Sequence, residues 1–330
     1  MKNIQLRFLA LSVLLIVFSQ QYIYAQVAIA KGIKKETFEF VKRDTTSLKL
    51  DVYTHPNIPK NSPCIIFVFG GGFITGKRDE EFYNTYFNTL VENKYVVVSI
   101  SYRLGLKGIK RFTNFSSTPL KSAVDLAVED LFDATKWVLK NANKMGIDTT
   151  KIILSGSSAG AMTVLQGDFE KRNKTELGKM LPEKFQYAGV IAFAGAVVTD
   201  NGRLKYKIKP APTMMFHGSS DKMVFYNRMY FFNRSVNGSN AIAEVFKKNN
   251  YPYYFYRVEG MGHEVAASPM EDNLKSVLWF ISEYVLKQKN YQIEHTFNDM
   301  DAKRDLFLTQ DDLLKKKKSS VKKRKKSKAH

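Results

Sequence analysis

Short apolar runs, each about as long as one β-strand, recur along the chain between more polar stretches. They occupy residues 64–69, 95–101, 151–155, 188–194 and 213–216. Runs that are apolar at nearly every position, rather than at alternate positions, are typical of strands buried on both faces of a sheet. The pattern therefore predicts that these five segments form the buried part of one sheet.

Helical patterns separate these strands. In residues 122–143 the apolar residues recur three or four positions apart, as on one face of a helix: Ala123, Ala127, Leu131, Ala134 and Val138. Residues 240–249 and 271–287 are further predicted helices, whereas the alternation in residues 37–54 favours antiparallel strands at one edge. Strands that alternate with helices predict an α/β protein, with a mostly parallel, doubly wound sheet and helices on both faces.

The strongest chemical signal follows the strand predicted at 151–155. Residues 156–160 read Gly-Ser-Ser-Ala-Gly, which fits the pattern G-x-S-x-G, and a predicted helix comes next. A sharp strand-to-helix turn needs small residues on both sides of the serine, and it holds the hydroxyl clear of the sheet. The start of a helix also stabilises developing negative charge. We therefore predict that Ser158 is a nucleophile.

Two residues further along the chain are suited to activate that serine. Asp221 comes just after the strand at 213–216, and His263 follows an apolar stretch at 253–258. Because a serine hydroxyl is a poor nucleophile at neutral pH, His263 would take its proton during attack and return it to the leaving group. Asp221 would fix the imidazole tautomer and stabilise the imidazolium. Asp200, one strand earlier, is the alternative acid.

Three consecutive glycines, residues 70–72, follow the strand at 64–69. Glycine lets the backbone approach a substrate closely and aim its N–H groups at a carbonyl oxygen. We predict that the N–H groups of Gly71, Gly72 and Ala159 form an oxyanion hole. The alternative interpretation of such a triplet is a flexible turn.

Taken together, these motifs resemble those of the α/β-hydrolase superfamily, in its carboxylesterase/lipase-like branch with an HGGG-type loop. The resemblance runs from about Leu48 to Tyr284. It rests on Leu50-Asp51-Val52-Tyr53, Phe69-Gly70-Gly71-Gly72-Phe73, Ser101-Tyr102-Arg103-Leu104, Gly146-Ile147-Asp148, the segment 156–160, His217-Gly218 with Asp221, and Gly262-His263. It implies the α/β-hydrolase fold and the hydrolysis of carboxylic esters through a covalent acyl-enzyme. Phe69 stands where the family usually has His, which leaves the hydrogen bonding of the loop open.

Other polar residues have simpler interpretations. His217, at a strand end, is predicted to orient the acid loop, and His295 is placed outside the domain. Arg103 is interpreted as a structural residue that pairs near the oxyanion loop. The acids of the helix at 122–143 are interpreted as its solvated or capping side: Asp125, Glu129, Asp130 and Asp133.

Composition excludes several classes of protein. With 44% hydrophobic and 13% aromatic residues, the chain can bury a sizeable core, so global disorder is excluded. The single cysteine, Cys64, excludes an internal disulfide framework and a multi-cysteine zinc site. Neither an HExxH motif nor an EF-hand loop occurs, and the glycine triplet lacks the P-loop pattern. We therefore predict neither a metal nor a cofactor.

The formal net charge of +20 looks like that of a nucleic-acid binder, but its location argues otherwise. Residues 315–330 hold ten Lys or Arg and no acid, so half of the charge belongs to that segment. Such a block repels itself and is predicted to be disordered, with weak contact to polyanions. No nucleic-acid-binding motif accompanies it, so we predict no specific nucleic-acid partner.

The first 25 residues have the pattern of a secretory signal peptide. Lys2 and Arg7 precede the apolar run 8–18, and Ala25 ends the segment at a small residue. An apolar run of this length is too short to span a bilayer of roughly 30 Å. We therefore expect an exported protein without a transmembrane segment in its mature chain; an uncleaved N-terminal anchor is the alternative.

The sequence thus predicts three parts: a signal peptide at 1–25, one catalytic domain at 26–290, and a polar, polybasic, disordered tail at 291–330. The expected function is a serine esterase that hydrolyses small or carbohydrate-linked esters through an acyl-enzyme on Ser158. A serine exopeptidase on the same scaffold is one alternative. A non-catalytic binding protein that retains the fold is another.

Overall fold

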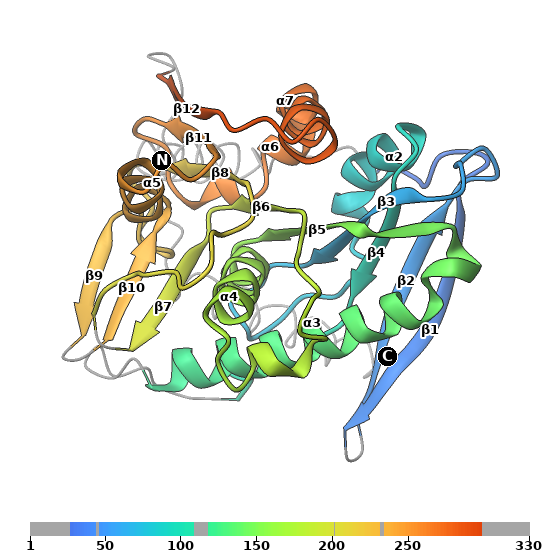
Figure 1. The fold of residues 1–330 in the computed structure, drawn as a ribbon, viewed down its shortest axis with the longest axis horizontal. Coiled ribbons are helices and arrows are strands. Elements are labelled where there is room, and N and C mark those ends of the chain that lie inside the picture. Colours follow the sequence, from blue (N-terminus) through green and yellow to red (C-terminus); the bar gives the residue numbers. More distant parts are fainter. Residues whose placement is uncertain (1–26, 44–45, 109–117, 201, 232–233, 299–330) are drawn as a thin grey trace, which may run out of the picture.

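The strands predicted from the apolar runs lie side by side in one central sheet (Figure 1). The computed structural model describes residues 27–43, 46–108, 118–200, 202–231 and 234–298. Within them, nine strands form this sheet, in the spatial order β1 (Lys34–Arg43), β2 (Thr46–Thr54), β4 (Val96–Ile100), β3 (Ser62–Val68), β5 (Ile147–Ser157), β6 (Gly189–Phe193), β8 (Thr213–Gly218), β11 (Tyr253–Val258) and β12 (Gln292–Phe297).

All neighbouring strands of the sheet are parallel except at one edge. There β1 pairs antiparallel with β2, and β2 pairs antiparallel with β4. The prediction of a mostly parallel sheet with an antiparallel edge is therefore confirmed. The side chains of β3, β4, β6 and β8 are almost wholly buried, as expected of strands that are covered on both faces.

Helices cover both faces of the sheet, as predicted. α3 and α4 pack against each other over one face, while α2, α6 and α7 lie together on the other (Figure 1). The α-helices of the described residues are α2 (Asn84–Glu92), α3 (Thr118–Met145), α4 (Ala159–Asn173), α5 (Ser239–Lys248), α6 (Pro269–Asp272) and α7 (Leu274–Phe280). Short 3₁₀ turns are η1 (Glu81–Tyr83), η2 (Gly178–Met180) and η3 (His263–Ala266), and the π-helical η4 (Ile281–Leu286) follows α7.

The helix predicted at 271–287 is interrupted. Asn273, with φ −119° and ψ 25°, leaves the helical region and separates α6 from α7, and the last turn is wound as a π-helix. The helical prediction for this segment is therefore confirmed except at Asn273, whose conformation ends one short helix before the next begins.

A second, smaller sheet was not predicted. It consists of β7 (Ala196–Asp200), β10 (Arg234–Gly238) and β9 (Arg228–Phe231), all antiparallel, at the lower left of Figure 1. Its interior contains polar side chains that bond to one another: the Thr199 hydroxyl lies 2.9 Å from that of Ser235, and the Asn237 amide donates to Ser235 Oγ over 2.9 Å. Strands with such polar interiors do not produce an apolar run in the sequence.

The predicted domain boundary at residue 290 is wrong. Strand β12 lies beyond it and pairs in parallel with β11, so the sheet extends through residue 297. The Tyr253 hydroxyl donates to Glu294 over 2.7 Å, and the ring of His295 stacks on Tyr256 at 4.4 Å. His295 therefore belongs to the domain. The strand is an exposed edge whose polar side chains face solvent, which is why it was interpreted as tail.

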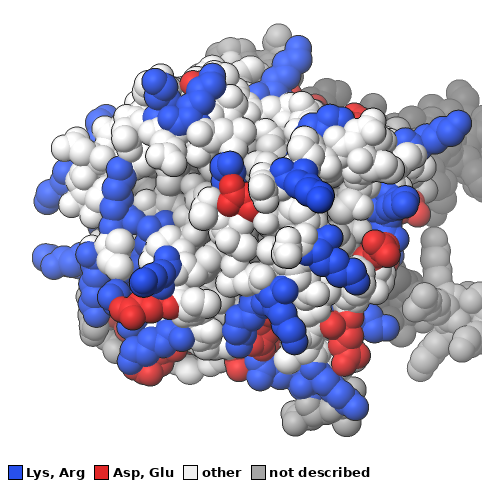
Figure 2. Space-filling view, turned by 45° about the vertical axis from the view of Figure 1, so that its right-hand side comes forward, with Lys and Arg blue, Asp and Glu red and all other residues white. Residues whose placement is uncertain are grey.

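The two terminal segments singled out in the sequence, 1–25 and 315–330, lie outside the described residues. Among the residues that are described, no helix combines the length and the apolar character needed to cross a membrane. Figure 2 shows basic side chains scattered over one face of the molecule, with acidic ones between them in several places. That face therefore carries no continuous basic stripe of the kind that tracks a nucleic acid.

Candidate active site

The serine of the G-x-S-x-G motif stands on a sharp turn between β5 and α4. Ser158 has φ 52° and ψ −115°, a conformation that residues other than glycine rarely adopt. Its N–H donates to Phe193 O over 2.8 Å, which fixes the turn to the neighbouring strand β6. The flanking glycines are required by close contacts: a Cβ on Gly160 would lie 1.9 Å from Val68 O, and one on Gly156 would lie 2.4 Å from Gly160 O. The turn is therefore the strained strand-to-helix turn that the motif predicts.

Three residues that are far apart in the sequence form one chain of hydrogen bonds. Ser158 Oγ lies 2.7 Å from His263 Nε2, and His263 Nδ1 lies 2.7 Å from Asp221 Oδ2. Each residue follows a different strand of the sheet, β5, β11 and β8 respectively, at the carboxyl ends where the loops of a parallel sheet meet. Because the carboxylate can only accept, His263 Nδ1 carries the proton and Nε2 accepts from the serine.

Asp221 is held as a charged acceptor. Its Oδ1 accepts from the N–H groups of Met223 and Val224, over 2.8 and 3.0 Å. Burial raises the pKa of this carboxyl, but the hydrogen bonds and electrostatic attraction from His217 and His263 outweigh that effect, and the pKa lies well below its usual range. The acid therefore stays ionised at neutral pH, as the orientation of an imidazole requires.

His217 supports the acid rather than the serine. Its Nε2 lies 3.3 Å from Asp221 Oδ2 and 3.0 Å from the carbonyl oxygen of Val224, and its Nδ1 lies 2.8 Å from Ser239 Oγ. Since a carbonyl oxygen only accepts, the proton sits on Nε2, and Ser239 donates to Nδ1. This buried ring braces the acid loop, in agreement with the expected orienting role.

The glycine loop lies directly against the serine turn. A Cβ on Gly70 would lie 3.1 Å from Ser157 O and 3.3 Å from Ser158 Cβ, so the two backbones are in contact. Gly71 and Gly72 have φ of 124° and 64°, and Gly71 O accepts from two N–H groups of the following turn. This hydrogen-bonded loop is not the flexible turn of the alternative interpretation.

The donors of the predicted oxyanion hole belong to the glycine loop, which contacts the serine turn through Gly70, and to the residue after Ser158. Within the described chain, the N–H groups of Gly71 and Gly72 have no hydrogen-bond acceptor. Ala159 is the first residue of α4, where an N–H group lacks an acceptor inside the helix. Three backbone N–H groups without an acceptor thus belong to the loop that contacts the serine turn and to the helix that begins after Ser158.

Known proteins match the part of the chain that carries the glycine loop and Ser158. Residues 50–201 match the family model described as BD-FAE, a span that includes the glycine loop and Ser158 but ends before Asp221 and His263. Among curated proteins, the chain is 34% identical to esterase B1 of Culex pipiens over 121 residues and 27% identical to para-nitrobenzyl esterase of Bacillus subtilis (strain 168) over 126 residues. These matches cover 36% and 38% of this chain but only 21% and 25% of the relatives, so the chain spans about a fifth to a quarter of their length.

Solved structures match over far more of the chain. Esterase 2 of Thermogutta terrifontis, phosphoramylated by tabun, aligns with a TM-score of 0.55 and 21% identity, covering 79% of this chain and 97% of that one. The butyrate-bound form of the same esterase gives a TM-score of 0.54 at 20% identity, covering 80% and 96%. The chain has the α/β-hydrolase fold.

Within this fold, the alternative acid is ruled out by its position. Asp200 ends β7 in the smaller sheet and pairs with Arg234, with 2.6 Å between Oδ1 and Nε. Its side chain is 51% exposed, whereas that of Asp221 is fully buried against His263. Asp221 is therefore the acid that the fold brings to the imidazole.

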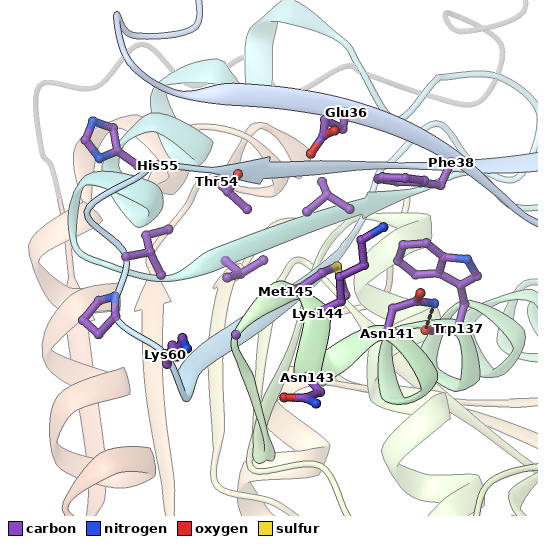
Figure 3. Close-up of a pocket in the computed structure, with 15 residues that line it drawn as sticks. Glu36, Phe38, Thr54, His55, Lys60, Trp137, Asn141, Asn143, Lys144 and Met145 are labelled. Carbon is purple, nitrogen blue, oxygen red and sulfur yellow. Dashed lines mark hydrogen bonds between the residues drawn. The ribbon is translucent and has the colours of Figure 1, made fainter.

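A groove of about 590 Å³ lies at the opposite end of the sheet (Figure 3). Its walls include His55 and Lys60 from the segment between β2 and β3, and Trp137 and Met145 from α3. These positions adjoin the amino ends of the parallel strands, whereas the serine, the histidine and the acid follow the carboxyl ends. The groove is therefore separate from the candidate active site.

Within the described residues, no group of three or more His, Cys, Asp and Glu side chains could hold a metal ion.

Sequence reasoning missed two polar groups that contact the site. Tyr83, in η1, accepts a hydrogen bond from the N–H of Gly70, and Ser157 donates to Ala266 O. No local motif marks either residue, because both contacts join segments that are distant in the sequence.

Proposed function

We propose that this α/β-hydrolase is a serine carboxylic-ester hydrolase that works through a covalent acyl-enzyme on Ser158. The observation that carries the proposal is the chain of two 2.7 Å hydrogen bonds from Ser158 through His263 to Asp221. The named relatives and structural neighbours are esterases, which supports the same chemistry.

The proposed reaction begins with attack of Ser158 Oγ on the ester carbonyl. A bond forms between Oγ and the carbonyl carbon as the hydroxyl proton moves to His263 Nε2. The carbonyl electrons pass to the oxygen, which the N–H groups of Gly71, Gly72 and Ala159 stabilise. Removing one such donor typically costs about 2.7–4 kcal/mol of transition-state stabilisation.

The second half returns the serine. The intermediate collapses, the bond to the alcohol oxygen breaks, and His263 gives its proton to that oxygen so that the alcohol leaves. A water molecule then attacks the acyl carbon while His263 takes one of its protons. Collapse of the second intermediate returns this proton to Ser158 and releases the carboxylic acid. Asp221 stays ionised throughout and stabilises the imidazolium.

The proposed substrates are small or carbohydrate-linked esters. A short acyl group is supported by the structural neighbour, whose solved forms include ones bound to butyrate and to propionate. For the alcohol side we propose a carbohydrate, which an exported enzyme would meet outside the cytoplasm. Export in turn rests on our proposal that residues 1–25 are cleaved after Ala25. The amino-terminal residue of the protein purified from its native host tests that cleavage.

The deciding experiment measures hydrolysis of p-nitrophenyl acetate, butyrate and octanoate by the wild type and by Ser158→Ala. We expect turnover to fall to the background rate in the variant while the fold, followed by circular dichroism, is retained. Equal rates in the two proteins would refute the proposal. Turnover of aminoacyl-anilides without ester turnover would indicate an exopeptidase. Failure of the folded wild type to react with a fluorophosphonate probe would indicate a non-catalytic binding protein.

A further inference from the structure

The oxyanion loop of this protein is held without the histidine that usually precedes its glycines. Phe69 stands in that place and is buried, with its ring stacked on Tyr102 at 4.4 Å. The Tyr102 hydroxyl donates to Phe69 O over 3.0 Å. The aromatic packing of Phe69 and the hydrogen bond from Tyr102 therefore fix the carbonyl group of Phe69, at the start of the loop.

A second phenol fixes the next residue of the loop. The N–H of Gly70 donates to Tyr83 Oη over 3.1 Å. Tyr83 is only 6% exposed, and its ring packs edge-on against Phe67 of β3 at 4.7 Å. Because the ring is packed in the core, its oxygen has a fixed position. Its hydrogen bond with Gly70 therefore fixes the position of the loop relative to the sheet.

The residue that Tyr83 holds lies against the serine turn. A Cβ on Gly70 would lie 3.1 Å from Ser157 Oγ, and the Ser157 hydroxyl donates to Ala266 O over 2.7 Å. Ala266 is the last residue of η3, the turn that begins with His263.

These contacts form one buried path: the Gly70 N–H donates to Tyr83, Gly70 packs against Ser157, and the Ser157 hydroxyl donates to Ala266 O. It joins the oxyanion loop, the serine turn and the histidine turn, which come from three separate parts of the chain. We propose that Tyr83 is a positioning residue that, through Gly70, sets the oxyanion donors relative to Ser158 and His263 and replaces the missing loop histidine. The inference rests on the proposed esterase function.

Loss of the phenol oxygen would leave the Gly70 N–H without its acceptor and free the loop to shift. Gly71 and Gly72 follow directly, so their N–H groups would move relative to the developing oxyanion. A displacement of about 1 Å can cost about 100-fold in rate. Because the donors act mainly on the transition state, the loss should fall on kcat rather than on KM.

The test compares Tyr83→Phe with Tyr86→Phe. Tyr86 lies on α2 next to η1 and is fully buried, and its hydroxyl bonds to Ser155 Oγ at 2.9 Å, within strand β5 rather than in a catalytic loop. Both changes remove one buried phenol oxygen. We expect Tyr83→Phe to lower kcat for p-nitrophenyl butyrate about 10- to 100-fold with KM within about threefold, and Tyr86→Phe to leave both constants near wild type.

Two further measurements separate positioning from a general loss of structure. An alkyl boronic acid, which mimics the tetrahedral intermediate, should bind Tyr83→Phe more weakly by about the same factor as the fall in kcat/KM. Ser157→Ala should also lower kcat, and the double variant should lose less than the product of the two single losses, because both residues act in one path.

Unchanged kcat in Tyr83→Phe, or equal losses in Tyr83→Phe and Tyr86→Phe, would overturn the inference. If Tyr83→Phe does not fold, the inference stands or falls with Ser157→Ala, which must lower kcat and weaken boronic acid binding. The underlying function fails in a different way, since a folded wild type without turnover of any ester would refute the esterase itself.

Discussion

At the scale of single residues, the site depends on backbone contacts as much as on catalytic side chains. The carbonyl oxygen of Val68 would lie 1.9 Å from a Cβ on Gly160, so strand β3 and the start of α4 can approach only because that side chain is absent. The same approach brings the glycine loop that follows β3 against Ser158. The glycines of the motif thus bring the nucleophile and the oxyanion donors together.

The low pKa of Asp221 predicts how stability depends on pH. An unfolded aspartate has a pKa of about 3.9, whereas the folded carboxyl keeps its charge to lower pH. Ionised Asp221 therefore stabilises the fold fully above about pH 4, and this contribution is lost as the pH falls through the lowered pKa. We expect the difference in unfolding free energy between wild type and Asp221→Asn to shrink as the pH is lowered from 5 to 3. Urea titrations would measure it, and a difference that grows would contradict the pKa direction.

At the scale of elements, a buried ion pair fixes helix α3 to the segment after β4. Asp130 was expected on the solvated side of its helix, but its side chain is fully buried. Its Oδ2 accepts from the N–H of Arg103 over 2.7 Å, and its Oδ1 lies 2.9 Å from the guanidinium. Arg103 thus has the expected structural role, and its partner is Asp130. The helical periodicity alone could not show that this acid is buried.

The two acids of α3 should differ sharply in their contribution to stability. Asp130→Ala removes the buried acceptor of Arg103, whose guanidinium keeps only its pair with Glu129, and should cost about 1–3 kcal/mol of unfolding free energy. Asp125 is the matched control, because its pair with Lys121 is an i,i+4 contact with the carboxyl 33% exposed, and its loss should cost less than about 1 kcal/mol. Denaturant titration of both variants measures the difference. Equal costs would show that the Arg103 pair is not a structural tie.

Strand β12 leads to a second prediction at the scale of elements. Truncation after Asn298 keeps the strand, whereas truncation after Asn290 removes it and uncovers the edge of β11. An uncovered edge strand is a template for association between chains. We expect the shorter protein to melt at a lower temperature and to aggregate, as measured by calorimetry and light scattering. Identical behaviour of the two truncations would show that β12 adds nothing to the domain.

At the scale of the whole molecule, the sequence predicted the features that neighbouring residues in the chain determine. Apolar runs identified the parallel strands, and the strand-then-motif order brought Ser158, Asp221 and His263 together. The smaller sheet was missed because its strands are only four or five residues long, and because β10 is mostly polar, with Thr199, Ser235 and Asn237 bonding to one another inside the sheet. β12 was missed because an edge strand need not be apolar. Tyr83 was missed because its contact with Gly70 exists only once α2 has packed on the sheet.

The charge of the molecule gives a prediction for the chain as a whole. Ten of its 51 Lys and Arg residues lie in 315–330, outside the catalytic loops. We expect deletion of 315–330 to leave ester turnover nearly unchanged and to lower the salt concentration needed to elute the protein from a polyanion column. A large loss of turnover on deletion would show that the basic segment belongs to the catalytic unit.

Cys64, the single cysteine of the chain, lies fully buried in the middle of the sheet, and burial raises the pKa of its thiol. A thiol that is both inaccessible and protonated does not react with maleimides or iodoacetamide at neutral pH. A cysteine introduced at any exposed position is therefore the sole site of labelling in the folded protein. Fluorescent or spin probes can be placed one at a time without first altering the native sequence.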